Sequence, residues 1–109
     1  MIERAHQSCK ILAAGTPPLT QGEIDAALQR LPGWEHREDA ICKTFSFKNF
    51  ADTMAFVNRV ARIAASEDHH PEMLVGYDRC RIAYSTHSIG GLSENDFICA
   101  AKIEALWAI

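Results

Sequence analysis

The sequence predicts an α+β fold, in which a four-stranded antiparallel sheet carries three helices on one face, in the order α-β-β-α-β-β-α. Two observations predict this fold. Strand-like segments come in two pairs, each joined by a few residues, and connections this short produce antiparallel hairpins. Helical patterns stand before, between and after the two pairs, so helices can cover one face while the other face stays open to a partner subunit.

The size and charge of the chain argue against several classes of protein. Its 109 residues suit one domain, and a composition of 48% hydrophobic and 23% charged residues is that of a globular protein. No apolar run approaches the roughly 20 residues that span a bilayer. The net charge is −3, with 11 basic residues scattered among 14 acidic ones. This balance argues against binding to nucleic acid or to an anionic membrane surface.

Residues 1–18 are expected to form an arm, and residues 19–109 the domain. The arm ends in Gly15-Thr16-Pro17-Pro18, which neither a helix nor a central strand accommodates. Its start has no long apolar stretch of the kind found in a signal peptide. We therefore expect a cytoplasmic protein with four reduced cysteines, which are Cys9, Cys42, Cys80 and Cys99.

The first helix and the first hairpin follow the arm. Thr20 is a candidate N-cap with Glu23 as its capping-box partner, and Pro32-Gly33 ends the helix. Residues 34–37 and 40–47 then have the pattern of two strands, joined by a two-residue turn.

The second helix has the clearest pattern in the chain. Asn49 is a candidate N-cap, and His69-His70-Pro71 ends the helix because the residue before a proline avoids the helical region. Apolar residues recur at steps of three and four, which predicts one buried stripe. The stripe consists of Phe47, Phe50, Met54, Val57, Ala61 and Ala64.

The second hairpin and the last helix complete the predicted fold. Met73–Tyr77 and Arg81–His87 have the pattern of two strands, joined by Asp78-Arg79-Cys80. Ser93 and Asp96 form a capping box in which Asp takes the usual place of Glu or Gln. The buried face of the helix that follows is predicted to be Cys99, Ala100, Ile103, Leu106 and Trp107.

Three of the five histidines, His69, His70 and His87, lie close to the ends of the second hairpin. Antiparallel pairing brings the start of one strand beside the end of the next, so the three imidazoles are expected to converge at one edge. Asp96 lies in the first turn of the helix just beyond His87. Because imidazole exchanges protons near neutral pH, this group of side chains points to acid–base chemistry.

Two other interpretations stay open on the residues alone. The histidines can be a solvated helix end and a half-exposed strand end, with Asp96 acting only as a helix cap. A zinc site made of the three histidines and Cys80 is less favoured, because the side chains of adjacent His69 and His70 diverge and no Cys-x-x-Cys or i, i+4 spacing is present.

Four landmarks in register resemble the signature of the pterin-4a-carbinolamine dehydratase family. They are His69-His70-Pro71-Glu72, Tyr77, Ser85-Thr86-His87 and the run Gly91-Leu92-Ser93-Glu94-x-Asp96. The similarity covers roughly residues 20–108 and leaves the first eighteen or so residues outside it. It also includes Leu31-Pro32-Gly33-Trp34, Lys48-Asn49-Phe50 and the helix from Met54 to Val60.

The resemblance implies the fold described above, a homodimer or homotetramer, and a dehydratase. The implied reaction converts 4a-hydroxytetrahydropterin to quinonoid dihydropterin and water, which recycles the pterin of aromatic amino-acid hydroxylases. Because only protons move, the resemblance implies no metal and no cofactor. By matching position, His69 and His87 resemble the acid–base pair. His70 resembles a pterin-contacting histidine, Pro71 would shape the pocket floor, and Asp96 matches an acid that supports the site.

One position departs from the family pattern. Many members carry a glutamate four residues before the first histidine, where this chain has Ala65, and Glu67 is a candidate substitute. Related chains also act as protein-interaction or assembly modules. The open sheet face and the arm make a non-enzymatic oligomeric module of the same fold the alternative function.

Overall fold

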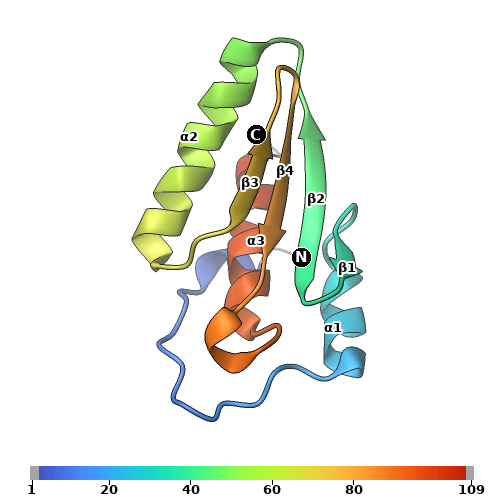
Figure 1. Ribbon diagram of the computed structural model, residues 1–109, viewed down its shortest axis with the longest axis vertical. Coiled ribbons are helices and arrows are strands. Elements are labelled where there is room, and N and C mark those ends of the chain that lie inside the picture. The colour runs from blue at the N-terminus through green and yellow to red at the C-terminus, as the bar shows by residue number, and fades with distance from the viewer. Residues whose placement is uncertain (1–2, 108–109) are drawn as a thin grey trace.

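The computed structural model describes residues 3–107, and its elements follow the predicted order. Every strand pairing is antiparallel, and the strands lie in the order β1-β2-β4-β3 (Figure 1). The predicted α+β fold is confirmed. The elements are α1 (Gln21–Leu28), β1 (Glu35–Arg37), β2 (Ala40–Ser46), α2 (Phe50–Glu67), β3 (Glu72–Val75), β4 (Arg79–Tyr84) and α3 (Glu94–Trp107), with short 3-10 turns at Glu3–His6 and His87–Ile89.

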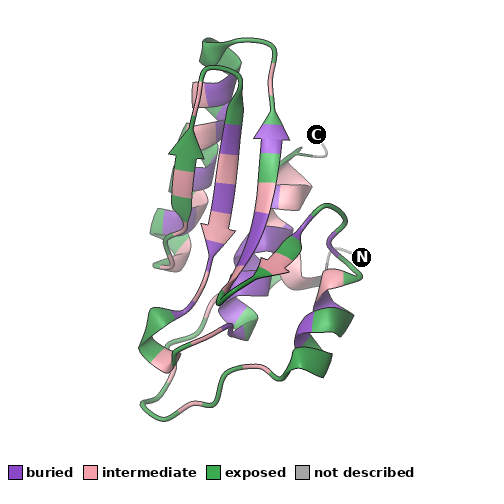
Figure 2. Cartoon of the chain, turned by 45° about the vertical axis from the view of Figure 1, so that its right-hand side comes forward, coloured by how far each residue is buried: buried purple, intermediate pink, exposed green. Residues whose placement is uncertain are grey.

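A single core lies between the sheet and the helices. In Figure 1, α3 runs behind the sheet, α2 runs alongside β3 at the left and α1 lies next to β1. All three helices contribute buried side chains to one cluster with β2 and β4, and Figure 2 shows this burial along α3 and the central strands. Alternation along β4 buries Cys80, Ile82 and Tyr84 and turns Arg81 and Ala83 to the opposite face. That face carries no helix in the described part of the chain.

Two predicted helix starts are confirmed. The Thr20 hydroxyl accepts a hydrogen bond from the Glu23 N–H at 3.2 Å, and the Glu23 carboxylate accepts one from the Thr20 N–H at 2.8 Å. At the start of α2, the Asn49 side-chain oxygen accepts a hydrogen bond from the Asp52 N–H at 2.8 Å. These caps satisfy N–H groups that the first helical turn leaves without partners.

The predicted buried stripe of α2 is correct only in part, because Phe47 and Val57 pack against the core whereas two other members do not. Phe50 is 49% exposed and Ala61 is exposed, whereas Ala64 is buried as predicted. Apolar side chains cover more than one face of α2, so periodicity alone could not choose which face meets the sheet and α3. The face that is buried there consists of Thr53, Phe56, Val60 and Ala64.

The boundaries of the second hairpin also differ from the prediction. β4 begins at Arg79, because the Gly76 N–H donates to the Arg79 carbonyl at 2.8 Å, and only Tyr77 and Asp78 lie between these two bonded residues. The strand ends at Tyr84, so His87 lies in the 3-10 turn beyond it instead of in the strand. Trp107, predicted to be buried, is 42% exposed, although its ring packs edge-on against the rings of Phe45, Phe47 and Phe56.

No helix in residues 3–107 combines the length and the apolar character needed to cross a membrane.

Candidate active site

The end of α2 and the underlying β4 strand together fix the position of His69. Asp68 has a left-handed conformation (φ 51°, ψ 42°), and the His69 N–H then donates to the Ala64 carbonyl at 3.1 Å, which turns the chain off the helix. The His69 ring stacks on the Tyr84 ring, with 5.1 Å between the ring centroids. The Tyr84 hydroxyl donates to the His69 carbonyl at 3.1 Å. Burial raises the pKa of Tyr84 far above its usual value, so the phenol stays a neutral donor.

Asp96 is fully buried, and both of its carboxylate oxygens have partners. Oδ1 lies 2.6 Å from His69 Nε2. Oδ2 accepts hydrogen bonds from the Ser93 N–H at 2.9 Å and from the Thr86 hydroxyl at 2.8 Å. Because Thr86 gives its only hydroxyl proton to Asp96, the Ser93 hydroxyl, 2.7 Å from the Thr86 oxygen, donates to Thr86.

The predicted capping box at the start of α3 is therefore half formed. The Asp96 carboxylate accepts from the Ser93 N–H as expected, but the Ser93 hydroxyl bonds to Thr86 and not to the Asp96 N–H. The backbone N–H of Asp96 donates instead to the Ser93 carbonyl at 3.1 Å. Asp96 thus caps the helix and holds His69 at the same time, so its structural and functional interpretations do not exclude each other.

The pair determines which atoms of His69 are available for chemistry. A carboxylate that accepts a proton from one ring nitrogen fixes the orientation and the tautomer of the imidazole. With Nε2 bonded to Asp96, Nδ1 is the nitrogen that can give or take a proton. The His69 side chain is 14% exposed, so most of the ring is shielded from water.

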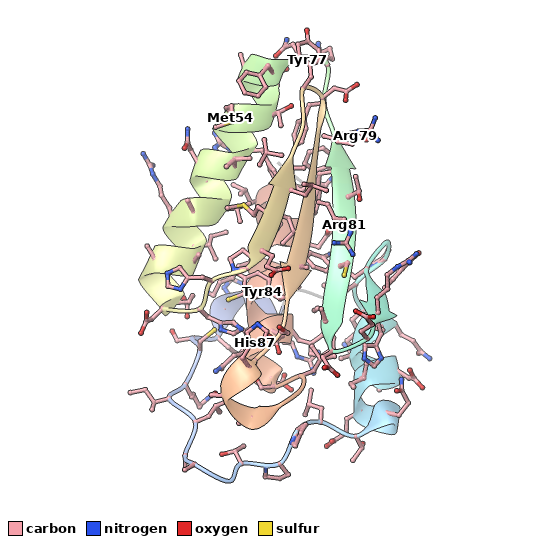
Figure 3. The ribbon with its side chains drawn as sticks, in the orientation of Figure 1. Met54, Tyr77, Arg79, Arg81, Tyr84 and His87 are labelled. Atoms are coloured by element: carbon pink, nitrogen blue, oxygen red, sulfur yellow. The ribbon has the colours of Figure 1, made fainter. Side chains whose placement is uncertain are left out.

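His70 and His87 line a hollow of about 240 Å³ on the open face of the sheet. Ala83 and Ser85 from β4 and its extension form part of its wall, and the His87 Nε2 atom lies 3.5 Å from the Ser85 hydroxyl oxygen. Figure 3 shows His87 just beyond the lower end of β4, near the label of Tyr84. The remaining lining comes from β3 and the β1–β2 turn: Arg37, Glu38, Asp39, Ala40 and Glu72.

The three histidines therefore lie in two adjoining groups. His70 and His87 share the hollow, whereas His69 is turned toward Asp96 and does not line it. Pro71 is half-buried and is likewise not part of the lining. Thr86 connects the two groups, because its hydroxyl bonds to Asp96 and its chain neighbour is His87.

Sequence reasoning missed the contribution of the first hairpin to this hollow. Glu38 and Asp39 were identified only as a turn, yet they form one side of it. The register explains their position: Ile41 pairs with Tyr84, which sets the β1–β2 turn beside the end of β4. Hairpin patterns alone do not indicate that β2 pairs with β4. The position of the β1–β2 turn beside the hollow therefore could not be predicted from the sequence.

Glu67 does not stand in for the glutamate that the chain lacks at position 65. Its carboxylate accepts a hydrogen bond from the backbone N–H of Cys9 at 2.7 Å and lies 3.6 Å from the Lys102 ammonium, away from the hollow. Cys80, considered as a metal ligand, is fully buried in the core. Across residues 3–107, no group of three or more His, Cys, Asp or Glu side chains is arranged to hold a metal ion.

Comparison with known proteins identifies the family. A family model described as pterin 4 alpha carbinolamine dehydratase matches residues 17–106. A protein of Nitrosomonas eutropha, provisionally named pterin-4-alpha-carbinolamine dehydratase, is 54% identical over 103 residues, covering 94% of this chain and 91% of its own. A protein of Nitrosospira multiformis with the same provisional name is 54% identical over 105 residues, covering 96% and 93%.

Two solved structures are similar in fold. The crystal structure of a transcriptional coactivator/pterin dehydratase from Brucella melitensis is 36% identical, covers 82% of this chain and 97% of its own, and has a TM-score of 0.79. A pterin dehydratase-like RuBisCO assembly factor of the alpha-carboxysome is 19% identical, with a TM-score of 0.55 and coverage of 94% and 92%. This second likeness shows a shared fold alone. With the family model matching most of its length and relatives at 54% identity, the chain belongs to the pterin 4 alpha carbinolamine dehydratase family.

Proposed function

We propose that this protein dehydrates 4a-hydroxytetrahydropterin to quinonoid dihydropterin by histidine acid–base catalysis. The observation that carries the proposal is the His69–Asp96 pair, held at 2.6 Å beside a hollow lined by two further histidines. The capping role of Asp96 uses Oδ2 and does not require an imidazole on Oδ1. General acid–base chemistry does need one, because the transferring nitrogen must point at the reacting atom.

The reaction requires two proton transfers and no electron transfer. One proton goes to the 4a hydroxyl as the C4a–O bond breaks and water leaves. The other leaves N5, whose N–H bonding pair forms the C4a=N5 double bond. We assign these transfers to His69 and His87, with the roles of acid and base open. His70 contacts the pterin, Asp96 orients His69, and Pro71 fixes the chain direction between His70 and β3.

We further propose that the protein is a cytoplasmic homodimer or homotetramer that recycles the pterin of aromatic amino-acid hydroxylases. The edge strand β3 supports the oligomer, because Leu74 and Val75 are 70% and 39% exposed there. An exposed apolar edge strand is a site where a second copy can pair. Phe50 and Tyr77 extend the apolar surface, with 6.5 Å between their stacked rings.

Stopped-flow measurement of 4a-hydroxytetrahydropterin decay tests the reaction. We expect the purified protein to accelerate the decay and to release quinonoid dihydropterin in equal amount. Decay at the buffer rate would overturn the dehydratase proposal. It would leave the non-enzymatic module, whose partner binding would survive loss of the histidines.

A further inference from the structure

The middle of the N-terminal arm connects two helix ends that carry site residues. The Cys9 N–H donates to the Glu67 carboxylate at 2.7 Å, in the last turn of α2. The next residue, Lys10, makes two bonds to the side chain of Asn95 in the first turn of α3. Its N–H donates to the Asn95 oxygen at 2.9 Å, and its carbonyl accepts from the Asn95 amide nitrogen at 2.8 Å.

The same two helix ends hold the His69–Asp96 pair. Glu67 precedes His69 by two residues, and Asn95 immediately precedes Asp96. The contacts of the arm with Glu67 and Asn95 and the His69–Asp96 bond therefore both depend on the distance between the end of α2 and the start of α3. The arm spans that distance through two consecutive residues, Cys9 and Lys10, and the imidazole–carboxylate bond spans it as well.

Other contacts keep this part of the arm in place. The Cys9 sulfur lies 3.5 Å from the Cys99 sulfur and 3.6 Å from the Asn95 carbonyl oxygen. The Lys102 ammonium donates to the Ala5 carbonyl at 2.9 Å and lies 3.6 Å from the Glu67 carboxylate. The Glu67 and Lys102 side chains are only 11% and 19% exposed, so these polar groups are costly to leave without partners.

We propose that the arm is a strap that fixes the geometry of the His69–Asp96 pair, with Glu67 and Asn95 as its positioning residues. Neither residue lines the hollow, so each acts through the backbone that carries its neighbour. This inference rests on the proposed function for its effect on turnover, but not for its effect on the imidazole–carboxylate bond. Small displacements of an acid–base group have large effects on rate, which makes such a strap functionally important.

The test follows the His69 imidazole proton that is bonded to Asp96, by proton NMR of the full-length protein. In the Asn95→Ala variant, which loses both bonds to Lys10, we expect this proton to exchange with water about 10-fold faster than in the wild type. We expect kcat for 4a-hydroxytetrahydropterin to fall about 10-fold with KM unchanged, because the hollow is not altered. Glu67→Ala should likewise accelerate exchange of the His69 proton and lower kcat. Glu67→Gln, which keeps an acceptor for the Cys9 N–H, should stay close to the wild type.

A matched control separates positioning from loss of stability. Asn49→Ala removes the cap at the opposite end of α2, so it should lower stability without changing proton exchange at His69. Unchanged exchange in both Asn95→Ala and Glu67→Ala, or equal acceleration in Asn49→Ala, would overturn the strap. If Asn95→Ala does not fold, the exchange rates of the His69 proton in Glu67→Ala and Glu67→Gln decide whether the arm positions the pair. A wild-type protein without dehydratase activity would refute the proposed function, while the exchange measurement would still decide the strap.

Discussion

The Nε2 atom of His69 lies 2.6 Å from Oδ1 of Asp96, although 27 positions separate the two residues in the chain. One residue follows the last turn of α2, and the other lies in the first turn of α3. The bond therefore joins two helix ends and orients an imidazole beside a hollow.

The Asp96→Asn variant is expected to lose both stability and activity. The amide cannot accept from His69, Thr86 and Ser93 as the carboxylate does, and it leaves a buried polar cluster partly unsatisfied. We expect the free energy of unfolding to fall by about 3 kcal/mol and kcat to fall about 100-fold. Urea denaturation and stopped-flow kinetics measure the two effects. Asp52→Asn, at an exposed position in the first turn of α2, is the control and should change stability by less than about 1 kcal/mol.

Stability is expected to fall at alkaline pH because thiols and a phenol are buried. Burial raises the pKa of Cys9, Cys99 and Tyr84 above their usual values. The folded chain then keeps protons that the unfolded chain releases above about pH 9. The free energy of unfolding should not depend on these groups below about pH 8. Above pH 9 it should fall by up to about 1.4 kcal/mol per pH unit for each group.

Urea denaturation at several pH values measures this slope, and Cys9→Ala provides the comparison. Removing the Cys9 thiol should reduce the loss of unfolding free energy per pH unit above pH 9. A wild-type stability that stays constant to pH 10.5, or rises, would show that the groups ionise as readily in the folded chain as in the unfolded one.

The Asn49→Ala variant should lose about 1 kcal/mol of unfolding free energy. The Asn49 side chain accepts the N–H of Asp52 at 2.8 Å, and alanine leaves that donor to water alone. Asn58→Ala replaces the same residue type at an exposed position inside α2, where alanine favours the helix. In chemical denaturation, the changes in unfolding free energy of the two variants should have opposite signs. Equal losses of unfolding free energy would argue against a capping role for Asn49.

The Leu74→Glu variant should shift the protein from oligomer to monomer. Leu74 is 70% exposed on edge strand β3 and lies opposite Arg81, so a glutamate there gains a cation within the same subunit. If two subunits pair through their β3 edges, the two introduced glutamates would place like charges close together. Analytical ultracentrifugation should find the wild type as a dimer or tetramer and the variant at 12.1 kDa, the mass of one chain. Ile11→Glu, at a fully exposed apolar position on the arm, should not change the assembly.

The sequence allowed most of the fold to be predicted because the decisive signals are local. The capping box at Thr20 and the cap at Asn49 depend on residues three positions apart. The alternation in β4 likewise separates Ile82 and Tyr84 from Arg81 over a few residues. Local hydrogen-bonding and alternation rules apply in the same way whatever the rest of the chain does.

The features that could not be predicted depend on long-range packing. Which face of α2 is buried follows from its position against the sheet and α3, and its apolar residues are compatible with more than one face. The orientation of Glu67 toward Cys9, 58 residues away, has no local signal. The three histidines were found from hairpin geometry. Their division between the Asp96 pair and the hollow depends on a 3-10 turn at His87 that the strand pattern did not indicate.

The most direct test of the account compares two double variants in a stopped-flow assay of 4a-hydroxytetrahydropterin dehydration. One variant carries His69→Ala and His87→Ala. The other carries His6→Ala and His36→Ala, which removes two histidines outside the site. We predict that the first loses at least about 100-fold of the wild-type kcat/KM and that the second keeps it. Equal rates in the two variants would contradict the assignment of the chemistry to this site.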